Sequence, residues 1–366
     1  MKKLFGFIRM VILLTNIFFA VAMVVSAFSP YIPPNRFPFL SGLGIVFPIF
    51  LLIMVFFSLF WLVFYRKLIW ISLLTLLICS VQIRTVLPIN LPKAAPKDAI
   101  KILSYNSMAM QSQKKPTRRS PNSVLQYMQE SKADIIFIQE FITSKNKQYL
   151  QKREVDSVLK AYTYKNYLRC GTQTVNGLAC YSKYPILSSR LIAYDSKYNG
   201  GTISEIKINN DTIVCINNHL ESNKLTRKDR ALYKDIIIHP EAQKTSLISQ
   251  RLIKKLGEAT VIRAKQADLM AHLIDSVLQK NRPLVVCGDF NDTPISYTYR
   301  TASKQLHDAF VRTGNGLGIS YNQSGFYFRI DNILYSDHFK AYNCVIDRKP
   351  EGSDHYPIKC ALQLNN

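Results

Sequence analysis

The sequence predicts a mixed-sheet α/β domain preceded by an all-helical membrane segment, and three observations carry this prediction. Residues 1–97 contain long apolar runs and nine Lys or Arg, but no Asp or Glu. From residue 99 onward, short apolar strands alternate with helical stretches and turns. Carboxylate, amide and histidine side chains recur where those strands end. We therefore expect a helical segment over 1–86, a linker over 87–98 and an α/β domain over 99–366.

The apolar runs of the first segment lie at about 10–29, 43–64 and 68–83. A bilayer core of roughly 30 Å needs about 20 apolar residues in a helix, so the first two runs suffice and the third is marginal. This predicts a transmembrane anchor of two to three helices. Two alternatives stay open: the first run is a cleaved secretory signal, or the third lies on the membrane without crossing it.

Basic residues predict the orientation of the anchor. Lys2, Lys3 and Arg9 precede or begin the first run, and Arg66 with Lys67 separates the second run from the third. Positively charged turns stay in the cytoplasm, so three spans would deliver the remaining chain to the outer side. We expect a multi-pass protein of a bacterial inner membrane whose large domain is extracytoplasmic.

The charge of the large domain indicates which partners it could bind, and its cysteines indicate which disulfides or metal sites it could form. Outside the first 97 residues the chain has 38 basic and 24 acidic side chains, a net charge of +14. This balance favours anionic partners such as nucleic acid or lipid headgroups, although a solvated basic surface is an equal alternative. Cys170 with Cys180, or Cys344 with Cys360, could pair in an oxidising compartment. The cysteine spacing matches no zinc site.

Apolar alternation and turn residues predict the elements of this domain. Strands are expected over 99–106, 134–140, 175–187, 202–220 (a hairpin turning at 209–211), 283–290, 328–336, 340–347 and 356–364. A helix is expected over 120–131, with Ser120 as its cap and Pro121 at its first position. A second helical stretch spans 242–280, and we expect an interruption near Gly257.

Polar residues at the strand ends form the candidate site. They are Asn106, Glu140, His219, Asp289, Asn291, Asp331, Asp354 and His355. Taken singly, each has a local explanation, such as a turn that an Asn or Asp stabilises. As a set they supply hard oxygen ligands and histidine, which suit Mg²⁺ or Mn²⁺ better than zinc or copper. A histidine beside an acid can move protons or bind a phosphoryl oxygen.

The order of the short motifs resembles the endonuclease/exonuclease/phosphatase family. The motifs are YNS at 105–107, IQE at 138–140, GLACYSKYPI at 177–186, NNHL at 217–220, GDFND at 288–292, RIDNIL at 329–334 and SDHYPI at 353–358. The resemblance covers residues 99–364. It implies a four-layer α-β-β-α sandwich of two mixed sheets and a metal-dependent hydrolysis of phosphoesters at one edge.

The resemblance also implies a role for each motif residue. Glu140 would be the principal ligand of Mg²⁺ (or Mn²⁺), with Asn106 and Asp354 near the ion. Asp289 would orient or deprotonate the attacking water, and Asn291 would hold a phosphoryl oxygen. His355, paired with Asp331, would face the phosphate, and His219 would contact it from the other side.

One position departs from the family pattern, and the substrate stays open. Some nucleases of the family carry an Asp where this chain has Met108, which argues against an abasic-site endonuclease in particular. A nucleic-acid substrate is favoured by the basic loop 111–120 and by nearby tyrosines, namely Tyr194, Tyr198, Tyr297, Tyr299 and Tyr321. A phospholipid headgroup is favoured by the anchor. An alternative outside the enzymes is a membrane-tethered binding protein that has this fold but no turnover. The sequence indicates no protein partner.

Overall fold

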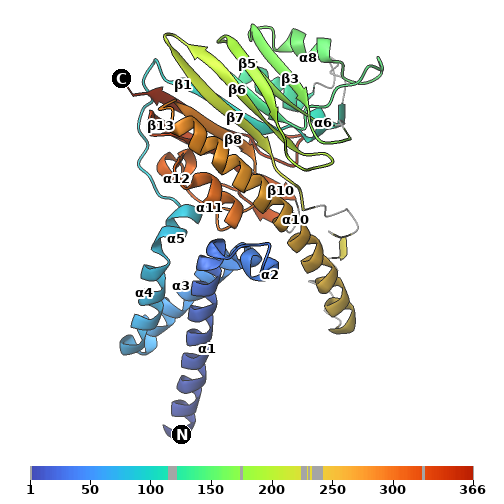
Figure 1. Ribbon diagram of the computed structural model, residues 1–366. Helices are drawn as coiled ribbons and strands as arrows, with labels where there is room; N and C mark the ends of the chain where they lie inside the picture. The colour runs from blue at the N-terminus through green and yellow to red at the C-terminus, as the bar shows by residue number, and fades with distance from the viewer. Residues whose placement is uncertain are drawn as a thin grey trace.

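The computed structural model describes residues 2–113, 122–173, 176–223, 229, 231–232, 242–323 and 326–365 (Figure 1). Its N-terminal part is helical and its remainder is an α/β sandwich. In Figure 1 the helical part extends from one edge of the sandwich.

The N-terminal segment contains five α-helices and three short connecting turns of helix among its described residues. In chain order they are α1 (Lys2–Phe28), η1 (Ser29–Tyr31), α2 (Pro38–Ser41), η2 (Gly42–Val46), α3 (Phe47–Phe64), η3 (Arg66–Leu68), α4 (Ile69–Ile78) and α5 (Ser80–Val86). Lys3–Tyr31 and Pro38–Phe64 are each long and apolar enough to cross a membrane. The third apolar run is a bent pair, α4 and α5, with a 65° angle, which would count as a third span only if both helices form one.

Two six-stranded sheets form the sandwich within the described residues. Sheet A has the order β13 (Phe339–Ile346), β14 (Ile358–Leu364), β1 (Ile100–Asn106), β2 (Ile135–Gln139), β4 (Gly177–Ser182), β3 (Tyr164–Arg169). Sheet B has the order β5 (Ile186–Ile192), β6 (Gly200–Ile208), β7 (Asp211–His219), β8 (Leu284–Asp289), β12 (Asp331–Tyr335), β9 (His307–Asp308). Each sheet is antiparallel except for one parallel pair, β1 with β2 and β7 with β8.

Alternation along the strands builds the four predicted layers. Ile102 of β1 points between the sheets and packs with Cys215 and Cys287, whereas its neighbour Leu103 points outward. Successive side chains of a strand face opposite sides, so both faces of each sheet are covered. Sheet A is covered by α6 (Met108–Gln113), α7 (Ser123–Glu130) and α8 (Lys152–Val158), and sheet B by α10 (Ala242–Leu278) and α11 (Tyr297–Ser303). This confirms the predicted sandwich.

Two smaller elements complete the domain near the inter-sheet core. Helix α12 (Ala309–Thr313) contributes Ala309 and Phe310 to the core between the sheets. A hairpin of β10 (Tyr321–Gln323) and β11 (Phe326–Phe328) precedes β12. All seven cysteines are buried free thiols, so neither of the two possible pairs is joined.

Two helix predictions were wrong in their details. Helix α10 continues through Gly257, because a glycine inside a helix costs only about 1 kcal/mol relative to alanine and does not by itself break it. A Cβ at this position would lie 3.4 Å from Pro38 of α2, which is an ordinary contact distance. Helix α7 begins at Ser123, and Asn122 caps it by accepting a hydrogen bond from the Leu125 amide. The expected cap at residue 120 lies outside the described residues.

Candidate active site

The carboxyl ends of the two parallel strand pairs lie together at one edge of the sandwich. Asn106 ends β1 opposite Gln139 of β2, and His219 ends β7 opposite Asp289 of β8. The Asn106 side chain bridges the two sheets by donating a hydrogen bond from Nδ2 to Asp289 Oδ2, at 2.9 Å. Residues that are more than 180 positions apart in the chain therefore share one buried site.

The backbone around Asp289 explains the residues on either side of it. Gly288 has φ +124°, and a Cβ there would lie 2.0 Å from the carbonyl oxygen of Asn218 on the neighbouring strand. Only glycine allows the two strands to approach so closely at this point. Asn291 has φ 52°, donates its amide to Asp289 Oδ1 and donates its side-chain Nδ2 to the Leu220 carbonyl. The loop thus turns sharply and fixes the Asp289 carboxylate.

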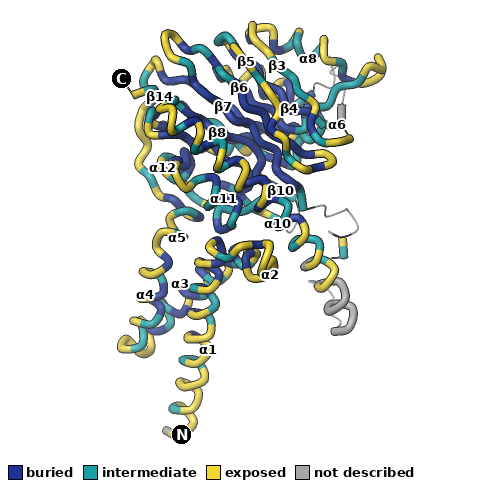
Figure 2. The backbone as a smooth tube through the Cα atoms, viewed as in Figure 1, coloured by how far each residue is buried: buried dark blue, intermediate teal, exposed yellow. Residues whose placement is uncertain are grey.

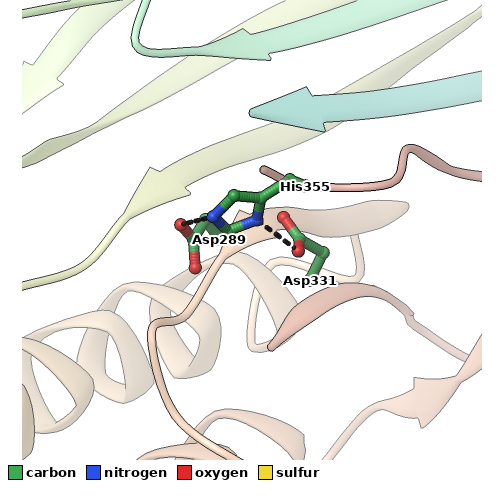
Figure 3. A group of neighbouring side chains, drawn as sticks. All are labelled: Asp289, Asp331 and His355. Atoms are coloured by element: carbon green, nitrogen blue, oxygen red, sulfur yellow. Dashed lines mark hydrogen bonds and ion pairs between the residues drawn. The ribbon is translucent and has the colours of Figure 1, made fainter. Parts of the chain in front are cut away.

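His355 lies between two carboxylates, as Figure 3 shows. Its Nδ1 is 2.8 Å from Asp331 Oδ2 and its Nε2 is 3.6 Å from Asp289 Oδ2. Burial alone would lower the pKa of His355, but Asp331 and Asp289 outweigh it and raise the pKa to about 10. Burial raises the pKa of Asp289 to about 6, against the attraction of the charged His355.

Glu140 occupies the opposite side of the site, directly after β2. Its backbone is left-handed, with φ 53°, and its Oε2 accepts a hydrogen bond from the Ala109 amide at 3.1 Å. Burial raises the pKa of Glu140, and the negative charge of Asp354 raises it further. The Asp354 carboxylate therefore acts electrostatically on Glu140.

His219 connects the two sides. Its Nε2 is 3.8 Å from Glu140 Oε1 and 3.7 Å from Asp289 Oδ2. Burial lowers its pKa, which favours the neutral imidazole. The Nδ1 atom is buried and has no hydrogen-bond partner among the described residues. The two histidines of the site are thus in different environments: His355 is held as a cation and His219 as a neutral ring.

The donor set fits a hard divalent cation. Glu140 and Asp354 repel each other, and Asp331 Oδ1 is a buried oxygen without a partner among the described residues. A cation of this kind would relieve the repulsion and stabilise the ionised carboxylates. Asp289, Asp331 and His355 also have ligand atoms within 4.8 Å of one another. Asp331 Oδ2 and His355 Nδ1 are already joined to each other at 2.8 Å, so Glu140, Asn106 and Asp354 stay the proposed ligands.

Arg263 is a site residue that the sequence analysis did not single out. It lies on α10, is 2% exposed, and its Nε is 3.2 Å from Asp292 Oδ2. It also donates to the Glu221 carbonyl at 3.0 Å and to Asn223 Oδ1 at 2.7 Å. This guanidinium joins the loops after β7 and β8. The sequence does contain a signal for this residue. Arg263 falls at helical spacing from Ala267, Met270 and Ile274, so it lies on the buried apolar face of the helix.

The five tyrosines expected to stack on bases have different environments. Tyr299 is buried and donates to Asp308, and Tyr194 donates to Asn218, so both have structural contacts. Tyr297 donates to Asp268, and Tyr198 is 47% exposed. Tyr321 packs against His355, with ring centroids 5.1 Å apart. Of the basic loop 111–120, residues 114–120 lie outside the described residues.

Fold and site define a class: two-sheet α/β sandwich proteins with an acidic, histidine-containing cluster where the central parallel strands end. Within this class the chain belongs to the endonuclease/exonuclease/phosphatase family, which matches residues 103–355. Members of this family are typically hydrolases of phosphoester bonds that use divalent metals. Residues 9–86 match a domain of unknown function, DUF8431. No curated protein matches the chain.

Solved structures share the fold at low sequence identity. The human Nocturnin catalytic domain superimposes with a TM-score of 0.51 and 15% identity, covering 74% of this chain and 97% of that one. An endonuclease/exonuclease/phosphatase from Beutenbergia cavernae gives 0.50 and 13%, covering 73% and 72%. Sphingomyelinase C from Streptomyces griseocarneus gives 0.48 and 13%, covering 73% and 99%. At these identities the first two superpositions show the fold alone.

Proposed function

We propose that the protein is a membrane-anchored, divalent-metal-dependent phosphoesterase, nuclease-like or phosphatase-like, that hydrolyses its ester by in-line attack of water. The observation that carries the proposal is the bridge from Asn106 to Asp289, which joins the strand ends of both sheets in one buried site with Glu140, Asp331 and His355. A lipid-headgroup phosphoesterase is the alternative within this class. A binding protein without turnover is the alternative outside it.

Each side chain has a task that its environment supports. Asp289 orients the attacking water and takes its proton, because its raised pKa makes it a better base than an exposed aspartate. His355, held charged by Asp331, donates to a phosphoryl oxygen, and Asn291 and His219 position the ester. Mg²⁺ or Mn²⁺ held by Glu140, Asn106 and Asp354 would supply charge neutralisation at phosphorus.

The N-terminal segment is proposed to be the membrane anchor, residues 1–86, joined through 87–98 to the catalytic domain, 99–366. Large apolar side chains cover its outer surface, for example Leu52 at 71% exposed and Val63 at 72% exposed (Figure 2). Exposure of so wide an apolar surface to water is unfavourable, whereas its contact with the hydrocarbon core of a bilayer is favourable. The proposed location is the bacterial inner membrane, with the catalytic domain outside the cytoplasm.

Substitution of Glu140 tests the proposed function. The full-length protein in detergent is assayed with Mg²⁺ on bis(p-nitrophenyl) phosphate, a soluble phosphodiester. We expect Glu140→Gln to reduce kcat/KM at least about 100-fold, because a carboxylate ligand of the proposed metal ion is lost. The matched control is Glu130→Gln, an exposed glutamate of α7 whose side chain bonds only within its own helix. Chelation by EDTA should abolish turnover reversibly. Equal turnover by Glu140→Gln and the wild type would exclude this assignment.

A further inference from the structure

The edge of the sandwich that holds the candidate site rests on the outer end of the anchor. Ile295 follows β8 by six residues, is 3% exposed and packs in the same apolar cluster as Met23, Phe47 and Met54 of the anchor. At Gly44 of η2, a Cβ would lie 1.7 Å from the Ile295 carbonyl oxygen. The loop that carries Asp289 and Asn291 is therefore in direct contact with the membrane segment.

Further contacts fix the domain on the anchor from several sides. The Arg300 guanidinium lies 3.9 Å from the centre of the Tyr31 ring, and Gly257 of α10 faces Pro38. Arg329 donates to the Thr85 carbonyl at 3.1 Å, close to where α5 ends. The linker itself is held as well, because Asn90 donates to the carbonyls of residues 311 and 314. The domain is docked in one orientation, although the composition of 87–98 is that of a loose tether.

Chain length limits how far the site can be from the bilayer. An extended chain spans at most about 3.6 Å per residue, so the Cα atoms of Asn291 and Ile295 are within roughly 14 Å, and those of Asp289 and Ile295 within roughly 22 Å. The headgroup layer on one side of a bilayer is about 5–8 Å thick. The Cα atoms of Asp289 and Asn291 are thus within roughly 22 Å of the point where their loop packs on the anchor.

The residues between α1 and α3 match a membrane interface. Five large apolar side chains here are exposed in the absence of lipid: Tyr31 (56%), Phe37 (56%), Phe39 (57%), Leu40 (39%) and Ile45 (36%). Aromatic side chains at the level of the headgroups anchor membrane proteins at the water boundary. In Figure 1 this segment, which includes α2, lies between the anchor helices and the edge of the sandwich near α10 and β10.

We propose that this edge is a membrane-facing surface and that the substrate is a phosphoester carried by a lipid headgroup in the leaflet on that side. The inference rests on the proposed phosphoesterase function. A bilayer-held headgroup enters the site from the side where the anchor is docked, whereas a nucleic acid duplex would have to pass between the domain and the membrane. In the reaction, the oxygen of water bonds to phosphorus, the ester P–O bond breaks, and the proton of the water passes to the leaving oxygen.

The test compares a lipid ester with a soluble ester on the same protein. The full chain is reconstituted in phosphatidylcholine vesicles that contain a phospholipid with a p-nitrophenyl phosphodiester headgroup, and bis(p-nitrophenyl) phosphate is the soluble probe. A second lipid carries the same ester on a long oligo(ethylene glycol) spacer. We expect the directly attached ester to be cleaved at least tenfold faster than the spacer-borne one. Plasmid DNA is the third substrate.

Two neighbouring glycines supply a matched pair of variants. Gly44→Ala would collide with the Ile295 carbonyl, whereas a Cβ at Gly42 meets nothing within 4 Å in the same turn of helix. We expect Gly44→Ala to lower the ratio of lipid to soluble turnover about tenfold or more, and Gly42→Ala to leave it unchanged. If Gly44→Ala cannot be recovered, the two lipid probes on the wild type decide.

Each outcome has one meaning. Cleavage of the soluble ester with faster cleavage of the spacer-borne lipid, or of DNA, would overturn the membrane-facing inference and leave the phosphoesterase intact. No cleavage of any probe with Mg²⁺ or Mn²⁺ would instead overturn the proposed function. An equal loss on both esters in Gly44→Ala would show that the contact shapes the site itself without directing it to lipid, which also contradicts the inference.

Discussion

Gly288 is the residue that decides where the Asp289 carboxylate lies. Its φ of +124° is a conformation that side chains with a Cβ rarely adopt, and the carbonyl of Asn218 fills the place where a Cβ would be. The motif GDFND therefore combines a steric requirement at its first position with chemistry at its second. Asn291, which is left-handed at φ 52°, completes the turn as asparagine readily does.

Alanine substitutions at Gly288 and at Gly316 can be compared to separate the effect of the steric clash at Gly288 from the effect of its positive φ. We expect Gly288→Ala to lower the unfolding free energy by about 3 kcal/mol or more, and to reduce turnover of the soluble ester about 100-fold, because Asp289 must move. The comparison is Gly316→Ala, where φ is +79° but the space is open. That variant should lose only about 1–2 kcal/mol and keep its activity. Denaturation and kinetics measure both; similar losses would refute the steric explanation.

Strand β12 is held at its beginning by a buried ion pair. Arg329 is 3% exposed, and its Nη1 is 2.6 Å from Asp308 Oδ2 at the end of β9. The same guanidinium reaches Asn332 and the carbonyl of Thr85 in α5. One side chain therefore joins two strands of sheet B and the anchor, two residues before Asp331.

We expect that replacing Arg329 destabilises sheet B. In Arg329→Met the Asp308 carboxylate stays buried without its cation, so we expect the unfolding free energy to fall by about 3–5 kcal/mol. The control is Arg282→Met, which breaks the half-exposed pair with Glu205 and should cost no more than about 1 kcal/mol. Urea denaturation in detergent, followed by far-UV circular dichroism, measures both. A similar small loss in the two variants would mean that the buried pair does not stabilise β12.

At the scale of the whole molecule, the anchor has an interior of its own. Asn16 is fully buried among the helices, and its Oδ1 accepts hydrogen bonds from Trp61 Nε1 at 2.9 Å and from Ser72 Oγ at 3.3 Å. This connects α1, α3 and α4 through one polar side chain. Both tryptophans of the chain, Trp61 and Trp70, lie in the anchor, so tryptophan fluorescence reports on the anchor alone.

This arrangement allows the two parts of the molecule to be followed separately. We expect Asn16→Leu to weaken helix packing by about 1–2 kcal/mol, because Trp61 and Ser72 lose their acceptor in an apolar environment. The thermal transition of tryptophan fluorescence in vesicles should move to lower temperature, while turnover of the soluble ester is retained. Thr15→Leu, at an exposed neighbour that bonds only within its helix, is the control. An unchanged transition in Asn16→Leu would contradict the role of this cluster.

The sequence by itself determined a mixed-sheet α/β domain, the apolar helices and the strand-end positions of Asn106, Glu140, His219 and Asp289. These follow from patterns that are local in the chain, namely the period of apolar residues, the length of apolar runs and the polar residue at each strand end. The family resemblance added the arrangement of the layers and the expected role of each motif residue, which stays a prediction.

Only the tertiary structure decided what depends on contacts between distant segments. Gly257 has the sequence signal of a helix interruption, yet α10 continues through it and lies against Pro38 of the N-terminal segment. An arginine in a helix is usually exposed, but Arg263 is buried because the loops after β7 and β8 contact it through Glu221 and Asp292. The contact of Gly44 with Ile295 joins residues about 250 positions apart, and no local pattern encodes which parts of two surfaces meet. The orientation of the sandwich on the N-terminal helices is therefore a property of the folded molecule, because it arises from packing between the two.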